Sequence, residues 1–304
     1  MNTAQAGTIT LGEGLTVNRI GFGAARIVAG RRALGALEHE AGVRALLRRV
    51  PELGIDFIDT ADCYGPFISE ELIGSTLAPY RSGLKVGTKV GLYRREGGVE
   101  FRVSGRREHI FEAVEGSLRR LRLDCIPLYQ LHRIDRKTPI EETAGAFADL
   151  IQQGKIGYVG LSEVTVPQIE AFRALIPIAS VQNLFNLVDR QHEAVLDYCE
   201  REGIAFIPWY PLATGLISEK EALVEIAAAH DATPNQIALA WLLRRSPCIL
   251  TIPGTSSIKH LEENVGAADV RLSDDDFQRL SALWTGTPLH DSGGRRSDEP
   301  GFDA

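Results

Sequence analysis

The stretch GIDFIDTADCYG, residues 54–65, decides the fold of this chain. Its apolar pair Phe57-Ile58 predicts a short buried strand, and the strand runs directly into a polar loop that carries two carboxylates, a thiol and a phenol. Reactive side chains just past the last apolar residue of a strand are typical of α/β barrels, whose active sites lie at the carboxyl ends of the strands. Asp59 and Tyr64 are therefore predicted to be half of a catalytic group.

Outward from this stretch, short apolar runs alternate with polar loops and helical patterns. The eight runs lie at residues 20–24, 55–59, 84–90, 125–131, 157–162, 178–183, 204–209 and 248–253. Alternating β and α units imply parallel strands with right-handed crossovers, and this number of units closes a barrel more readily than it forms an open sheet. We expect a (β/α)8 TIM barrel that residues 1–304 form as a single domain, with a β-hairpin at residues 8–18 before the first strand.

Helix signals are clearest at two places. Apolar residues between 140 and 151 recur at helical spacing, with Thr138-Pro139 as N-cap and first-turn proline and Gly154 as the stop. Thr233-Pro234 opens a second predicted helix in the same way. Residues 285–304 are polar and rich in glycine and proline, so they are expected to form a partly disordered tail.

The composition excludes several classes of partner. The chain is 44% hydrophobic and 24% charged with a formal net charge of -7, which favours neither nucleic acid nor an anionic membrane. Its four cysteines are far apart, as expected of reduced thiols. No basic start with a following apolar stretch indicates a signal peptide, and no run approaches the roughly 18 apolar residues of a membrane span. We expect a cytoplasmic protein, a monomer or a small homo-oligomer.

Two other kinds of site are disfavoured. A doubly wound dinucleotide fold requires G-x-G-x-x-G between its first strand and helix, and the best candidate stretch, residues 21–26, lacks the third glycine. The seven histidines stand singly, without the spacing of metal ligands, so no metal site is predicted.

Polar residues at the ends of the next two strands complete the catalytic group. The third strand ends in Lys89, and His132 follows the fourth. A free phenol has a pKa of about 10, which a neighbouring ammonium group lowers. An aspartate paired with the lysine keeps it charged, and a histidine can orient the reacting oxygen. Each residue alone could have a purely structural role, but Asp59, Tyr64, Lys89 and His132 together predict proton transfer.

Seven stretches, in order over nearly the whole chain, carry a resemblance to a known family. They are GIDFIDTADCYG (54–65), TKV (88–90), LYQLHR (128–133), GYVGLSE (157–163), VQNLFN (181–186), PWYPLATG (208–215) and IPGTSSIKHLEEN (252–264). The chain resembles the aldo-keto reductases, and its GLSEV and IPGTSS segments are similar to the bacterial branch that includes pyridoxal reductases. The resemblance implies a barrel that reduces a carbonyl with NADP(H), without metal or flavin. It assigns Tyr64 as general acid, Lys89 and Asp59 as the pair that tunes it, and His132 as the substrate-orienting residue.

The resemblance also implies a cofactor site along the strand ends. Ser162 and Gln182 would bond the nicotinamide carboxamide, and Trp209 would stack on the ring. The full set of implied cofactor residues is Gly23, Ala24, Ser162, Gln182, Trp209, Pro211, Leu212, Thr214, Gly254, Thr255, Ser256, Lys259, Glu263 and Asn264.

Two positions depart from the family pattern. Glu163 stands where the family often has asparagine, next to the carboxamide contact. The loop after the last strand carries hydroxyls at residues 255–257, where many relatives have a lysine or arginine that grips the 2′-phosphate. Those hydroxyls, the amides of the next helix and Lys259 can still bind a phosphate. NADP(H) is the expected cofactor, with NAD(H) as the alternative.

Substrate choice is expected to depend on the rim of the barrel. The candidate residues are Arg26, Ile27, Cys63, Tyr93 and Arg133, with Cys63 as a pocket wall. The expected substrate is a small aldehyde or ketone, and pyridoxal is a candidate. Two rival hypotheses are a Schiff-base lyase with Lys89 as nucleophile and a regulatory barrel that senses the cofactor with little turnover.

Overall fold

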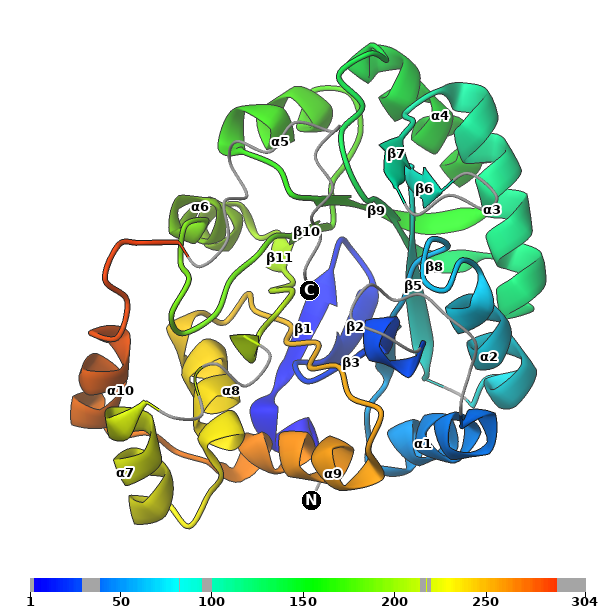
Figure 1. Ribbon diagram of the computed structural model, residues 1–304. Helices are drawn as coiled ribbons and strands as arrows, with labels where there is room; N and C mark the ends of the chain where they lie inside the picture. The colour runs from blue at the N-terminus through cyan, green and yellow to red at the C-terminus, as the bar shows by residue number, and fades with distance from the viewer. Residues whose placement is uncertain are drawn as a thin grey trace.

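The computed structural model describes residues 3–28, 39–81, 83–94, 100–213, 217 and 220–288. Within these residues, one parallel sheet has the strand order β11-β10-β9-β8-β5-β4-β3. The strands are β3 (Phe22–Gly23), β4 (Phe57–Asp59), β5 (Lys85–Val90), β8 (Ile126–Leu131), β9 (Ile156–Ser162), β10 (Ser180–Gln182) and β11 (Ala205–Phe206). The sheet curls around a central axis with the helices outside it (Figure 1). These strands follow the first seven predicted apolar runs in chain order, and only β9 extends beyond its run, by the single residue Ile156.

The last apolar run, residues 248–253, joins the two edges of the sheet. Ile249 forms a parallel bridge with Phe206 of β11, and Thr251 forms one with Ile20, just before β3. The barrel predicted from the sequence is thereby confirmed. Its last strand is reduced to these isolated bridges and is shorter than the run suggested.

The N-terminal hairpin fills one end of the barrel. β1 (Thr8–Leu11) pairs antiparallel with β2 (Leu15–Asn18), which confirms the hairpin predicted over residues 8–18. The apolar side of the hairpin packs against residues that face the barrel interior. This cluster comprises Ile9, Leu11, Leu15 and Val17 from the hairpin and Phe57, Leu128, Ala179, Ala205, Ile207, Leu250 and Ile252 from the barrel. Because this end is closed by apolar side chains, any polar site inside the barrel lies at the opposite end.

Helices surround the sheet (Figure 1). They are α1 (Glu40–Glu52), α2 (Ile68–Leu77), α3 (Arg107–Leu121), α4 (Ile140–Gln152), α5 (Val166–Arg173), α6 (Glu193–Glu202), α7 (Glu221–Ala229), α8 (Pro234–Arg245), α9 (Ile258–Gly266) and α10 (Asp274–Ser281), with short 3-10 helices at Thr3–Ala6, Ala24–Ile27 and Ala267–Asp269. α9 contacts both α8 and α1 and so closes the ring of helices. In the part of the chain that the structure describes, no helix has the length and apolar character needed to cross a membrane.

The two sequence-based helix predictions hold with one correction. α8 starts after Thr233, whose hydroxyl accepts a hydrogen bond from the Gln236 backbone N–H at 3.3 Å, as predicted. α4 has Pro139 as its N-cap residue, so the prediction of Thr138 as N-cap was wrong by one residue. The Thr138 hydroxyl donates to the Asp135 carboxylate at 2.7 Å instead, because a carboxylate is the stronger acceptor.

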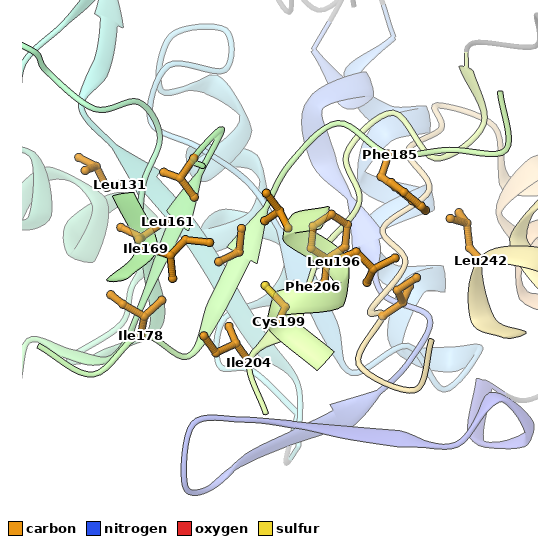
Figure 2. Close-up of a cluster of buried hydrophobic side chains, with 14 of the residues drawn as sticks. Leu131, Leu161, Ile169, Ile178, Phe185, Leu196, Cys199, Ile204, Phe206 and Leu242 are labelled. Carbon is orange, nitrogen blue, oxygen red and sulfur yellow. The ribbon is translucent and has the colours of Figure 1, made fainter. Parts of the chain in front are cut away.

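The main hydrophobic core lies between the strands and α5, α6 and α8 (Figure 2). In Figure 2, Leu161 of β9 and Ile169 of α5 lie at one end of this cluster, Phe206 of β11 and Leu196 of α6 in its middle, and Leu242 of α8 at the other end. All five are buried. Full burial of one such side chain contributes about 1.5–3 kcal/mol. The outward faces of the strands are fixed by this packing, and their inward faces are left for other side chains.

A second hairpin follows β5 and was not predicted. β6 (Leu92–Arg94) pairs antiparallel with β7 (Phe101–Val103). Each strand has three residues, which is too short for the period-2 alternation that predicts a strand.

Helices α2 and α3 approach each other closely at Gly74. A Cβ atom added to Gly74 would lie 2.0 Å from the backbone oxygen of Arg120. The same interface buries Glu70, whose carboxylate accepts hydrogen bonds from the Thr88 hydroxyl at 2.6 Å and from Arg120 Nε at 2.7 Å. This ion pair ties α2 and α3 to the outer face of β5.

Gly74→Ala is therefore expected to lower the free energy of unfolding by about 1–3 kcal/mol, the usual cost of overpacking a closed interface. Gly145→Ala in α4 is the matched control, because a methyl group there meets nothing within 4 Å. Alanine's higher helix propensity should raise the stability of that control by up to about 1 kcal/mol. Urea unfolding followed by circular dichroism measures both variants, and equal effects would contradict the role of Gly74.

Candidate active site

The inward faces of four strands form a buried polar layer inside the barrel. Because alternate residues of a strand face the same side, Asp59 of β4, Lys89 of β5, Gln130 of β8 and Gln182 of β10 all turn inward, and all four are buried. Gly160 of β9 leaves space for this layer, since a Cβ atom there would lie 2.8 Å from Gln130 Cγ. These four side chains are called the polar layer below.

Asp59 is the common acceptor of the polar layer. Lys89 Nζ donates to Asp59 Oδ2 at 2.5 Å. Gln130 Nε2 and Gln182 Nε2 both donate to Asp59 Oδ1, at 2.9 Å and 3.0 Å. A buried carboxylate costs little only when charge and hydrogen bonds compensate it, and here one cation and two amides do so.

Lys89 is held in its charged form. Its ammonium group also donates to the backbone oxygen of Thr60 at 2.8 Å. Burial lowers the pKa of Lys89, but the neighbouring groups, with Asp59 first among them, together outweigh burial, so the pKa is raised above its usual value. The sequence-based pairing of Lys89 with Asp59 is present in the structure.

Tyr64 lies next to this ion pair. Lys89 Nζ donates to Tyr64 Oη at 3.4 Å. Burial raises the pKa of Tyr64 to about 12, and the nearby Lys89 charge opposes that shift without cancelling it. The sequence analysis expected Lys89 to lower the pKa of Tyr64, and Lys89 does have that effect. The net direction was wrong, because burial destabilises the phenolate more than the Lys89 charge stabilises it. The phenol keeps its proton at neutral pH.

His132 completes the group around the phenol. Its ring meets the Tyr64 ring edge-on, with centroids 6.1 Å apart. Burial and the charges of Arg133 and Lys89 hold the pKa of His132 well below its usual range, so the imidazole is neutral. Its Nδ1 atom lies 3.6 Å from the sulfur of Cys63. The catalytic residues predicted from the sequence are therefore brought together.

Asp62, the second carboxylate of the 54–65 loop, is not part of the polar layer. Burial and the charge of Glu70 raise its pKa well above the usual value. Its Oδ1 atom makes no hydrogen bond to any residue that the structure describes. These features indicate a protonated side chain with a packing role. Among the described residues, no three His, Cys, Asp or Glu side chains lie close enough to hold a metal ion.

Gln130 is the residue that the sequence analysis missed. It binds the same oxygen of Asp59 as Gln182 and is fully buried. The signal was present, because Gln130 precedes His132 by two positions in a strand and so faces the same side. A glutamine inside the otherwise apolar run 126–131 was the clue.

Glu163, at the position where the resemblance implies asparagine, is a partly buried acceptor. It follows β9 with a φ of 55°, in the left-handed region that asparagine adopts more readily than glutamate. Its Oε1 atom accepts hydrogen bonds from Trp209 Nε1 at 2.6 Å and from the Leu184 backbone N–H at 2.8 Å. These bonds compensate the strain and fix the indole that was predicted to stack on a nicotinamide ring.

Ser162 and Arg133, predicted in different roles, are neighbours. Arg133 Nη1 donates to Ser162 Oγ at 3.2 Å and to the His132 backbone oxygen at 2.6 Å. Gln182 uses its amide nitrogen for Asp59, so a contact with a carboxamide would fall to its oxygen. Ser162 and Gln182 occupy paired positions of β9 and β10.

The other predicted substrate residues lie in two places, Tyr93 on β6 and the neighbours Arg26 and Ile27 in the 3-10 helix after β3. Tyr93 of β6 is half-buried and packs on His109 with ring centroids 4.8 Å apart. Arg26 is exposed in the 3-10 helix after β3. Ile27 is buried in the core beneath α1 and α2.

The loop before α9 has the chemistry to hold a phosphate group. Thr255 Oγ1 accepts from the Ser257 backbone N–H at 3.0 Å, and the Ser257 hydroxyl caps α9 by accepting from His260 N–H at 3.5 Å. The first turn of a helix presents N–H groups and a positive dipole end to an anion. Lys259 on that turn is 82% exposed and 3.7 Å from Glu263, so it is free to move toward a ligand.

The remaining predicted cofactor residues differ in burial. Gly254 is in tight backbone contact with Gly23, because a Cβ atom on Gly254 would lie 2.8 Å from the Gly23 oxygen. Of these predicted cofactor residues, Leu212 and Gly254 are half-buried and Ser256 is exposed. The buried ones are Gly23, Ala24, Pro211 and Asn264. Thr214 lies outside the described residues. Hydroxyls, an indole and a helix N-terminus along one side of the barrel fit an extended nucleotide better than a compact ligand.

The model of the aldo/keto reductase family matches residues 19–285 of this chain. The chain belongs to the aldo/keto reductase family. This match confirms the family resemblance found in the sequence motifs. It also confirms the prediction that the protein is an oxidoreductase that acts on aldehydes or ketones. The barrel and the polar layer of this reductase agree with that activity.

Relatives of this reductase extend over most of its length. The uncharacterized oxidoreductase C215.11c of Schizosaccharomyces pombe is 47% identical over 281 residues, which cover 92% of this reductase and 90% of the relative. Pyridoxine 4-dehydrogenase of Escherichia coli is 37% identical over 285 residues, which cover 92% and 99%. An aldo-keto reductase of Klebsiella pneumoniae, solved in complex with NADPH, matches with a TM-score of 0.79 at 27% identity, covering 91% of this reductase and 94% of that chain.

Proposed function

We propose that this reductase converts small aldehydes or ketones to alcohols with NADP(H), and that Tyr64 gives the proton to the carbonyl oxygen. The observation that carries the proposal is the contact of Lys89 Nζ with both Asp59, at 2.5 Å, and Tyr64 Oη, at 3.4 Å. A phenol that keeps its proton in the resting site can donate it, and an adjacent ammonium group stabilises the phenolate that remains.

The reduction needs a hydride at carbon and a proton at oxygen. NADPH, when bound, would supply the hydride and so become NADP+. The electron pair of the C=O double bond moves to oxygen, which takes the proton from Tyr64 Oη. Lys89 then neutralises the phenolate, Asp59 holds Lys89 in place, and neutral His132 orients the oxygen by hydrogen bonding. Each role matches the contacts and pKa directions described above.

The nucleotide would lie along the arc from β9 to α9. Ser162 and the Gln182 oxygen would bond the carboxamide, Trp209 would cover one face of the ring, and the α9 N-terminus would hold a phosphate. Support comes from the fixed position of Trp209, which Glu163 anchors at 2.6 Å, and from the Klebsiella pneumoniae relative solved with NADPH.

The test is loss of reduced-nucleotide absorbance with a panel of aldehydes and ketones. Pyridoxal belongs in the panel because one relative is named pyridoxine 4-dehydrogenase. Parallel assays with NADPH and NADH decide the cofactor preference. Consumption of NADPH with formation of the matching alcohol is expected. Tight nucleotide binding without turnover of any carbonyl would instead favour the cofactor-sensing barrel.

A Schiff-base lyase is the second chemical possibility for a buried lysine. Its nucleophile must lose a proton, whereas Asp59 keeps Lys89 charged and raises its pKa. Borohydride treatment in the presence of an aldehyde, followed by mass spectrometry of the peptide that contains Lys89, separates the two. An adduct on Lys89 would support the lyase and oppose reduction by Tyr64.

The pH dependence follows from two opposite pKa shifts. The acid form of Tyr64 is lost only as pH rises through about 12, and neutral His132 is lost only as pH falls well below its usual pKa. We expect kcat for reduction to stay flat between about pH 6 and pH 9. Steady-state rates at saturating substrate and nucleotide check this. A fall in kcat as pH drops through the ordinary histidine pKa of about 6.5 would contradict the neutral state assigned to His132.

A further inference from the structure

Cys63 and His132 form a buried pair beside the catalytic phenol. Cys63 Sγ lies 3.6 Å from His132 Nδ1, and both side chains are buried. In the described part of the chain, no other side chain bonds to the His132 ring. Cys63 packs against Ala61 and Leu92, and among the described residues its thiol has the His132 ring as its side-chain hydrogen-bond partner.

The chemistry of the two groups decides the direction of this hydrogen bond. An unprotonated imidazole nitrogen is a good acceptor, whereas thiol sulfur is a weak one and the S–H group is a donor. Burial raises the pKa of the Cys63 thiol, so the proton stays on sulfur. His132 is neutral, with one nitrogen as donor and the other as acceptor. These properties favour S–H as donor and Nδ1 as acceptor in this contact.

We propose that Cys63 is a positioning residue that fixes the tautomer of His132, through a thiol that donates to Nδ1 and leaves the ring proton on Nε2. The inference rests on the proposed role of His132 at the reacting oxygen. Nε2 lies on the side of the ring away from Cys63, and as an N–H donor it can bond a carbonyl oxygen. The other tautomer would present an acceptor to that oxygen and repel it.

One loop positions both the proton donor and the residue that orients His132. Cys63 directly precedes Tyr64 in the chain, so the loop that places the proton donor also places the group that orients His132. The edge-on contact of the Tyr64 and His132 rings keeps the two catalytic side chains at a fixed angle of 83°. A side chain without a donor at position 63 would hold the ring by packing alone and leave both tautomers accessible.

Substitutions at position 63 separate a hydrogen-bonding role from a packing role. Cys63→Val fills the space without a donor and is expected to lower kcat about tenfold, the scale of a misdirected hydrogen-bond donor at a reacting oxygen, with the nucleotide Kd unchanged. Cys63→Ser restores a donor and should recover kcat to within about threefold of the native enzyme. Cys199→Ala, which removes a buried thiol from the core beside α6, is the control for loss of a cysteine.

The tautomer is measured directly by long-range proton–nitrogen NMR correlations of the enzyme labelled with 15N-histidine. The chain has seven histidines, and the His132→Asn spectrum identifies the signals of His132 by their loss. We expect a neutral ring protonated on Nε2 in the native enzyme and in Cys63→Ser. In Cys63→Val we expect a mixture of the two tautomers, while Cys199→Ala should match the native spectrum.

The outcomes are distinguishable from failure of the proposed function. A native His132 protonated on Nδ1, or a Cys63→Val variant with native tautomer and native kcat, would overturn the role of Cys63. Parallel loss of kcat in Cys63→Val and Cys63→Ser would indicate packing alone and also overturn it. The NMR result does not depend on turnover, so it stands even if no carbonyl in the panel is reduced.

Discussion

Tyr64→Phe is expected to lower kcat for carbonyl reduction by about 10²–10⁴-fold, the range that a positioned general acid contributes. The substitution removes the hydroxyl that Lys89 contacts at 3.4 Å and leaves the ring in place. Without that proton donor, the oxygen that becomes negative as hydride arrives has no acid within reach. The measurement is kcat with a reactive aldehyde under saturating NADPH, together with the nucleotide Kd from fluorescence titration, which should not change.

Tyr80→Phe is the matched control for this substitution. Tyr80 donates to the backbone oxygen of Leu121 at 2.7 Å, between α2 and α3 and away from the polar layer. Its loss should cost about 1 kcal/mol of stability and leave kcat as it is. If Tyr64→Phe turned over at the native rate, another group would have to deliver the proton, and the central assignment would fail.

Lys89→Met is expected to lower the free energy of unfolding by about 3–5 kcal/mol, the cost of leaving one member of a buried ion pair without its partner. Asp59 would keep the bonds from Gln130 and Gln182 but lose the cation that compensates its charge. Reduction should also fall steeply, because Tyr64 loses the charge that stabilises its phenolate. Urea unfolding followed by circular dichroism gives the stability change.

Lys155→Met provides the control on the surface. Lys155 pairs with Glu115 while both side chains are partly exposed, and such pairs contribute about 0–1 kcal/mol. The double variant Asp59→Asn/Lys89→Met completes the test, because it removes both charges and should be less destabilised than the sum of the single changes. Strict additivity would mean that the two charges do not interact in the folded protein.

Much of this arrangement could be predicted from the sequence because it depends on local pattern. Strand ends in a parallel barrel converge at one end, so residues 59, 89 and 132 could be assigned to one site before their distances were known. The hairpin at residues 8–18 and the Thr233 cap likewise follow from short-range signals.

The features that the sequence analysis missed depend on contacts and charges between residues that are distant in the sequence. The Tyr64 pKa reflects competition between burial and the Lys89 charge, and only the folded environment determines which is larger. Gln130 and the Cys63–His132 contact depend on which side chains face each other across neighbouring strands and loops. The length of the last strand was overestimated at residues 248–253, because the extent of pairing depends on the neighbouring strands and here is limited to two isolated bridges.

The Trp209–Glu163 bond makes the indole a built-in optical reporter. Of the three tryptophans in the chain, Trp241 is buried in an aromatic stack with Phe185 and Phe277, far from solvent polarity changes. Within the described residues, Trp209 is the only one of the three bonded to a carboxylate, that of Glu163 beside Ser162. A reduced nicotinamide ring bound over this indole should quench the emission of Trp209. The nicotinamide should then fluoresce through energy transfer from the indole. Glu163→Gln should shift the starting emission while leaving that energy transfer in place.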